Sequence, residues 1–204
     1  MRGIFVNNKK PMLDRRKVAA EILKQRGDAL AVAGLGAPTW DTAAAGDSAL
    51  NFYTWGGMGG AAMIGLGLAL AQPGRRVLVI TGDGELLMGL GALATIAVQR
   101  PRNLAIIVMD NERYGETGMQ DTHTRFGVDL AGIAKSAGFR TSGTVYSAAQ
   151  LKTWIPRFYR QAGPVFCDIK VMTQAAPMVL PVRDGPTLRN RFREALLGAE
   201  QAYK

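Results

Sequence analysis

Short apolar segments alternate with longer segments of helical periodicity along most of the chain. The continuously apolar runs predict strands over residues 29–33, 76–81, 104–109 and 165–171. Apolar spacing predicts helices over residues 13–26, 59–72, 86–99, 128–137 and 148–161. This alternation is typical of an α/β fold, so we expect a doubly wound domain with a mainly parallel sheet flanked by helices.

Three segments depart from this pattern. Residues 38–50 are small and polar, which predicts a loop with one helical turn, and the polar residues 110–125 predict a long loop. Three prolines predict an irregular arm over residues 173–186, and a basic helix over residues 187–200 follows it. No linker or repeat interrupts the chain, so we expect residues 1–204 to form a single domain.

Gly82, Asp83 and Gly84 directly follow the second predicted strand and precede a predicted helix. In parallel sheets, ligands bind beyond the carboxyl ends of the strands. Glycine lets a ligand approach the backbone closely, and the start of a helix offers unpaired N–H groups that suit a phosphate. A carboxylate beside phosphates requires a cation between them, and Mg²⁺ is the usual one. The segment therefore predicts a site for a phosphate and a divalent metal.

The next predicted strand ends at Asp110 and Asn111. One helix and one strand fill residues 85–110, so the chain returns to the same edge of the sheet. The side-chain oxygen of Asn111 is then a candidate second metal ligand, and the backbone carbonyl of Arg113 is a candidate third. A Gly-Asp-Gly turn with an exposed aspartate is the alternative, but it does not account for Asn111 at the next strand end.

These segments resemble the thiamin diphosphate enzymes, in which a Gly-Asp-Gly, a helix, a strand and an asparagine follow one another at this interval. Residues 53–59 (YTWGGMG) look like the W-G-x-hydrophobic-G segment of that family, and residues 111–115 (NERYG) look like its N-x-x-Y-G segment. The resemblance makes Met58 the side chain that holds the cofactor in its bent shape, although methionine is also a common core residue. It implies that thiamin diphosphate is held by Gly57, Met58, Gly59, Gly82, Asp83, Gly84, Glu85, Asn111, Tyr114 and Gly115. It implies that Mg²⁺ is held by Asp83, Asn111 and the backbone carbonyl of Arg113.

Within the family, the chain resembles the small-subunit (beta) type of sulfopyruvate decarboxylase and the C-terminal part of phosphonopyruvate decarboxylase. The resemblance implies non-oxidative decarboxylation of a small anionic 2-oxo acid. It also implies a separate subunit with a pyrimidine-binding domain, which would supply the glutamate for ring nitrogen N1′, and a hetero-oligomer of α2β2 type or larger. A carboligase or oxidoreductase on the same cofactor, and a noncatalytic scaffold subunit, are the alternatives.

Further side chains have both a functional and a structural interpretation. His123, the only histidine, is either a proton donor or carboxylate binder on the substrate side or a loop residue without a role. Thr122 and Thr124 are its expected hydrogen-bonding neighbours. Arg113 is a candidate contact for an anionic substrate, and Glu85 is interpreted as capping the helix that it begins.

Composition and charge limit the classes of binding partner that we expect. The formal net charge of +9 favours an anionic small molecule, such as a dianionic 2-oxo acid, although a solvated basic surface explains it equally well. The basic residues are dispersed and no nucleic-acid motif is present, so no nucleic-acid partner is expected. The apolar run 61–71 is too short to span a membrane. A lone cysteine, expected to be buried and inert, and no signal-peptide pattern at residues 1–10 suit a cytoplasmic protein.

Overall fold

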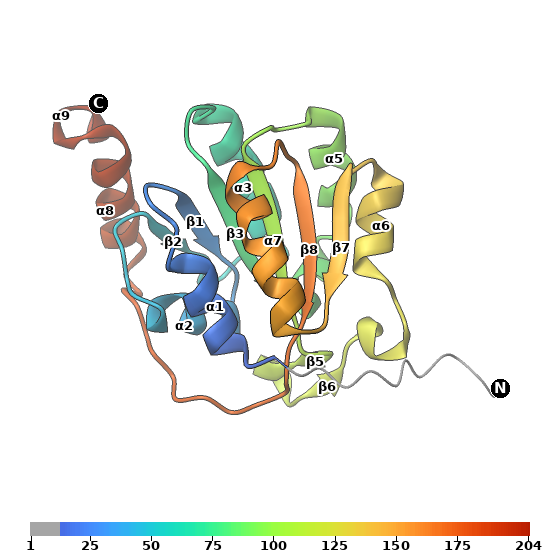
Figure 1. The fold of residues 1–204 in the computed structure, drawn as a ribbon. Coiled ribbons are helices and arrows are strands. Elements are labelled where there is room, and N and C mark those ends of the chain that lie inside the picture. Colours follow the sequence, from blue (N-terminus) through green and yellow to red (C-terminus); the bar gives the residue numbers. More distant parts are fainter. Residues whose placement is uncertain (1–12) are drawn as a thin grey trace.

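The computed structural model describes residues 13–204, which contain a six-stranded sheet and a two-stranded hairpin (Figure 1). The large sheet has the order β2-β1-β3-β4-β8-β7, and every neighbouring pair in it is parallel. Its strands are β1 (Leu30–Ala33), β2 (Asn51–Tyr53), β3 (Val77–Gly82), β4 (Leu104–Asp110), β7 (Thr141–Val145) and β8 (Val165–Lys170). The prediction for residues 1–10 lies outside the described residues.

Helices cover both faces of the large sheet. On one face, α1 (Arg15–Leu23) and α7 (Ala148–Arg160) pack against every second strand residue, such as Ile80. On the other face, α3 (Ala61–Ala71), α5 (Ala92–Gln99) and α6 (Leu130–Ala137) pack against the alternate residues, such as Val79. A strand covered on both faces must be apolar throughout, because successive side chains point to opposite faces. The predicted doubly wound α/β fold is confirmed.

Short polar side chains fix where several helices begin. Asp14, Asp129 and Ser147 precede α1, α6 and α7, and each accepts a hydrogen bond from a backbone N–H of the first turn. Asp184 does the same for α8 (Gly185–Leu197). These bonds satisfy donors that a helix cannot pair internally, so the ends of the helices are set locally by the sequence.

The helix predicted over residues 86–99 is in fact two helices, α4 (Asp83–Met88) and α5. The helix is interrupted at Gly89, which packs against the backbone of Gly59 and leaves no room there for a side chain. A Cβ atom on Gly89 would lie 2.1 Å from the carbonyl oxygen of Gly59. The single-helix prediction was wrong because apolar spacing carries no information on a contact between distant glycines.

The sequence pattern also missed both edge strands and one helix. β2 and β7 lie at the two edges of the sheet, and β7 is polar and half-buried over most of its length. An edge strand needs less apolar surface than a central one, so its sequence carries a weak signal. Helix α2 (Ala37–Ala44) and β2 lie within residues 37–53, where a loop with one helical turn was predicted over residues 38–50.

The predicted long loop 110–125 is folded rather than irregular. β5 (Arg113–Tyr114) and β6 (Gln120–Asp121) form an antiparallel hairpin, and 3₁₀ turns η1 (Gly115–Thr117) and η2 (His123–Phe126) complete the segment. These short elements lack apolar periodicity because little of their surface is buried.

The arm after β8 has no helix or strand from Met172 to Asp184, as predicted. It crosses below the carboxyl ends of the strands and leads to α8, which lies beside β2 (Figure 1). The indole of Trp55 donates to the carbonyl of Val182 at 2.9 Å, and Arg16 donates to the carbonyl of Pro177 at 2.7 Å. The hydroxyl of Thr173 also donates to the carbonyl of Asn111 at 3.0 Å, so the arm is held along its length by residues far away in the chain. α9 (Ala199–Ala202) follows α8.

Cys167 is fully buried in β8, as expected, and burial raises the pKa of its thiol well above the usual value. Among residues 13–204, no helix is both long and apolar enough to cross a bilayer.

We predict that Gly89→Ala lowers the free energy of unfolding by about 1–3 kcal/mol, because the added methyl group meets a backbone carbonyl that cannot move aside cheaply. Gly91→Ala is the matched control, because a Cβ on Gly91 meets no atom within 4 Å. Urea unfolding of both variants measures the difference, and equal stabilities would contradict the account of the helix break.

Candidate functional site

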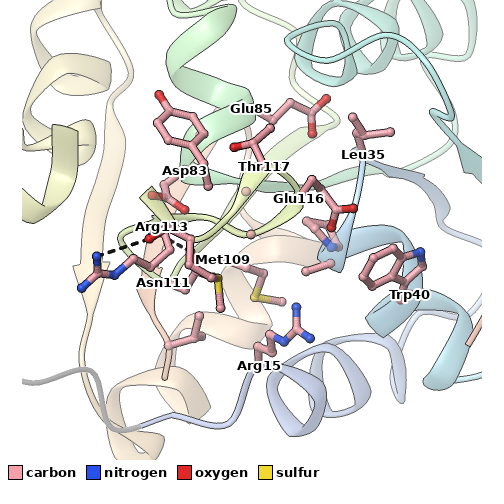
Figure 2. Close-up of a pocket in the computed structure, with 18 of the residues that line it drawn as sticks. Arg15, Leu35, Trp40, Asp83, Glu85, Met109, Asn111, Arg113, Glu116 and Thr117 are labelled. Carbon is pink, nitrogen blue, oxygen red and sulfur yellow. Dashed lines mark hydrogen bonds between the residues drawn. The ribbon is translucent and has the colours of Figure 1, made fainter. Parts of the chain in front are cut away.

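A cavity of about 280 Å³ opens at the carboxyl ends of the central strands (Figure 2). Its walls come from segments far apart in the sequence: α1, the loop after β1, the β3–α4 junction, the segment after β4 and the arm. This is the place that the general rule for parallel sheets assigns to a ligand.

Most of the residues predicted to hold the cofactor and the metal line this one cavity. They are Met58, Gly82, Asp83, Gly84, Glu85, Asn111, Arg113, Tyr114 and Gly115. Gly57 and Gly59 flank Met58 in the chain but do not belong to the lining. His123 lies on η2 with its side chain exposed, so the structure does not bring it to the other predicted residues.

Asp83 is buried at the start of α4, directly after β3. Its Oδ2 accepts hydrogen bonds from the hydroxyls of Thr122 and of Thr124, the latter at 3.3 Å. Burial, followed by the neighbouring carboxylate of Asp110, raises the pKa of Asp83 to about 7. The two threonines thus bond to carboxylates and not to His123, which corrects the expectation that they would be its neighbours.

A buried acidic cluster lies behind Asp83. The ammonium of Lys170 bonds to Asp110 and lies 3.5 Å from a carboxylate oxygen of Glu112 and 3.8 Å from one of Asp168. Burial lowers the pKa of Lys170, but these carboxylates outweigh it and the pKa is raised. Arg125 also pairs with Glu112, at 3.4 Å, so Lys170 is the cation that faces the buried carboxylates of Asp110 and Asp168. An excess of buried negative charge favours the binding of a cation.

Asn111 lies at the end of β4, beside this cluster, and its Oδ1 accepts the backbone N–H of Arg113 at 2.9 Å. Glu112, between them, has φ of 61°, which is unusual for a residue with a side chain and is commonest at functional sites. The Arg113 side chain forms an ion pair with Asp121 across the β5–β6 hairpin and also bonds to the carbonyl of Met119. The guanidinium of Arg113 is thus already paired within the protein, whereas a residue that binds substrate was expected to be unpaired.

The Gly84 backbone is pressed against an aromatic ring. A Cβ atom on Gly84 would lie 2.6 Å from the Tyr114 ring, so a side chain at this position would displace the wall of the cavity. Glu85 accepts a hydrogen bond from Thr81 at 2.7 Å and from the Ala61 backbone N–H at 3.4 Å. Glu85 therefore contacts the start of α3, not the start of its own helix as predicted.

The residues present fit a magnesium–diphosphate group. Within residues 13–204, no three His, Cys, Asp or Glu side chains are grouped in a way that could enclose a metal. A carboxylate and an amide oxygen on one cavity are instead what Mg²⁺ uses when phosphates and water fill its other positions. The observation that supports a cation here is the close approach of two buried carboxyl groups, Asp83 and Asp110, which both lie within hydrogen-bond distance of the Thr124 hydroxyl.

Comparison with known proteins agrees with this geometry. Residues 36–169 match the family described as thiamine pyrophosphate enzyme, C-terminal TPP binding domain, where thiamine pyrophosphate is another name for thiamin diphosphate. The chain belongs to this family. The matched segment contains every residue of the predicted cofactor and metal sites.

Relatives in this family include two decarboxylases. The chain is 37% identical to sulfopyruvate decarboxylase subunit beta from Methanothermobacter thermautotrophicus, over 93% of this chain and 99% of that one. It is 37% identical to phosphonopyruvate decarboxylase from Streptomyces hygroscopicus, over 71% of this chain but only 36% of the relative. The resemblance predicted from the motifs is thereby confirmed.

A solved structure shares the fold. A thiamine diphosphate-dependent 4-hydroxybenzoylformate decarboxylase from Rhodococcus jostii RHA1 superimposes with a TM-score of 0.68 at 19% identity. The match covers 86% of this chain and 35% of that protein. At this identity the likeness concerns the fold alone.

The sequence reasoning missed several residues of the site. Lys170 ends β8 and pairs with Asp110 in the register of the sheet, so the strand-end rule would have found it had β8 been placed beside β4. Thr124 was expected only as a neighbour of His123, in a segment interpreted as a loop. Arg15 lies within the predicted helix 13–26, and no local signal distinguishes an arginine that faces solvent from one that faces a cavity.

We predict that Thr124→Val lowers the free energy of unfolding by about 1–3 kcal/mol, because it removes the one hydroxyl that lies within hydrogen-bond distance of both buried carboxyl groups. Thr117→Val on the same segment is the control, since that hydroxyl bonds only to exposed Gln120, and it should change stability by less than about 0.5 kcal/mol. Chemical denaturation of both proteins gives the comparison. A Thr124→Val protein as stable as the control would show that the hydroxyl does not support the cluster.

Proposed function

We propose that this chain is the diphosphate- and magnesium-binding subunit of a thiamin diphosphate-dependent 2-oxo acid decarboxylase. The observation that carries the proposal is that Asp83 and Asn111, from the ends of two adjacent strands, line one cavity together with the Gly84 backbone. Similarity to a decarboxylase subunit over 99% of its length supports the reaction class.

Each group in the cavity has a role in holding the cofactor. Asp83, Asn111 and the backbone carbonyl of Arg113 would hold Mg²⁺, and through it the diphosphate, at the beginning of α4. Met58 would contact the rings of the cofactor, and Tyr114 and Gly115 would complete the wall of the cavity. When bound, thiamin diphosphate supplies the electron sink that decarboxylation of a 2-oxo acid requires. This chain contributes positioning and the exclusion of water.

We further propose that a partner subunit completes the site. The chain covers 99% of a relative that is named as a subunit but only 36% of phosphonopyruvate decarboxylase. The remainder of such a longer relative is the natural counterpart of the partner. In this arrangement the partner carries the pyrimidine-binding domain with its glutamate, and the two chains form a hetero-oligomer, of α2β2 type or larger.

The assignment is tested by the full chain purified with its candidate partner. We expect the complex to release CO₂ from a 2-oxo acid only when thiamin diphosphate and Mg²⁺ are both present. Formation of a carbon–carbon ligation product would favour a carboligase. Reduction of an added electron acceptor during the reaction would favour an oxidoreductase that uses the same cofactor. Binding of the cofactor to neither the chain nor the complex would instead identify a scaffold subunit.

We predict that Asp83→Asn weakens Mg²⁺-dependent cofactor binding by more than the roughly 10- to 100-fold typical of residues that only support a metal ligand. Asp28→Asn removes the same charge from an exposed side chain just before β1, at the amino ends of the strands and away from the cavity, and should leave the affinity unchanged. Titration calorimetry with thiamin diphosphate, with and without Mg²⁺, compares the two. Equal affinities would refute Asp83 as a ligand.

A further inference from the structure

Arg15 is a nearly buried cation on the wall of the cavity. It is the first residue of α1, its exposed fraction is only 7%, and it lines the cavity that holds Asp83 and Asn111. Figure 2 shows its guanidinium directed toward the interior of the cavity, on the side opposite Asp83. An arginine stays protonated when it is buried, so its charge must be balanced by a partner.

The protein itself balances this charge incompletely. Arg15 Nε lies 3.4 Å from Oδ2 of Asp41, but the geometry does not make a hydrogen bond. Within residues 13–204, the Arg15 guanidinium makes no hydrogen bond at all. Asp41 is moreover shared, because Arg16 donates to its other oxygen at 3.2 Å. Two guanidinium groups thus face one carboxylate, which leaves an excess of positive charge beside the cavity.

The other charged groups of the lining do not remove this excess. Arg113, the second cation of the lining, is paired with Asp121. Glu116 lies on the exposed rim and is near enough for the Arg15 charge to oppose the rise in its pKa that burial causes, but within residues 13–204 the only ion pair of Arg15 within 4 Å is with Asp41. The nitrogens of a guanidinium that are not used by one carboxylate can bind a second oxyanion in a two-pronged arrangement. Arg15 therefore has the geometry and the charge of an anion-binding residue.

We propose that Arg15 binds the second acid group of a 2-oxo acid substrate, that is, a sulfonate, phosphonate or carboxylate at the end remote from the keto carbon. This inference rests on the proposed function. The Asp83 side of the cavity already provides for the diphosphate, through the metal and the Gly84 backbone. The opposite side, where Arg15 lies, is then left for the substrate, and it is the side with unbalanced positive charge.

The test compares Arg15→Gln with Lys17→Gln. Both variants remove one positive charge from the first turn of α1, but Lys17 is exposed and only Arg15 lines the cavity. The full chain with its partner is first titrated with thiamin diphosphate and Mg²⁺, and the loaded complex is then titrated with phosphonoacetate and, separately, with propionate. Calorimetry reports binding without any turnover.

We expect Arg15→Gln to weaken phosphonoacetate binding by about tenfold or more, the size of a lost charge-assisted hydrogen bond, and to leave propionate and cofactor binding unchanged. Lys17→Gln should bind all three ligands as the unaltered protein does. Equal phosphonoacetate affinity in the two variants would overturn the proposal. Weakened cofactor binding with unchanged phosphonoacetate binding would overturn it too, and would assign Arg15 to the diphosphate.

Two further measurements apply if a variant does not fold or if the complex does not bind the cofactor. If Arg15→Gln does not fold, Arg15→Lys replaces it: a point charge without the guanidinium fork should give a smaller but measurable loss, and no loss would refute the role. If the unaltered complex binds no thiamin diphosphate, the proposed function fails. Phosphonoacetate binding to the same protein then still decides whether Arg15 marks an anion site.

Discussion

The parallel register of β3, β4 and β8 is the constraint on which the site depends. Gly82 lies opposite Met109, and Asp110 lies opposite Lys170, so the three strands end at the same level. The residues that follow β3 and β4 must therefore emerge side by side. A shift of one residue in either pairing would turn the alternating side chains to the wrong face, and burial on both faces forbids it.

This alignment concentrates acidic groups where the protein has little to balance them. Carboxylates from β4 and β8 and from the start of α4 surround one lysine, and burial raises the pKa of both Asp83 and Asp168. Such a cluster is costly in the absence of a cation. It is explained if the site is built for the ligand-bound state, in which a divalent metal supplies the missing positive charge.

The far side of the cavity is built differently. Its wall comes from α1 and from the arm, whose backbone carbonyls accept hydrogen bonds from Trp55 and Arg16. Arm side chains contribute as well, because Arg183 lies over the Trp55 ring and the Thr173 hydroxyl donates to the carbonyl of Asn111. The two sides of the cavity thus differ in charge, with carboxylates around Asp83 and an arginine opposite them. That asymmetry suits a ligand whose two ends are recognised in different ways.

The sequence by itself determined the fold class, the central strands and the family. Central strands must be apolar throughout, and a glycine–aspartate–glycine turn after one of them is a local feature that needs no knowledge of distant contacts. The edge strands β2 and β7, the break between α4 and α5, and the folded segment after Asn111 were not predictable in this way. Each depends on a neighbour far away in the chain, as Gly89 depends on Gly59.

The same distinction holds within the site. Asp83 and Asn111 could be placed together because both follow strands of one sheet, and strand order in a parallel sheet is strongly restricted. The threonines that bond to Asp83, the lysine that joins Asp110 and the orientation of Arg15 were decided only by tertiary structure. Hydrogen bonds and ion pairs between distant segments produce no local sequence pattern, because they depend on how those segments pack in the folded protein.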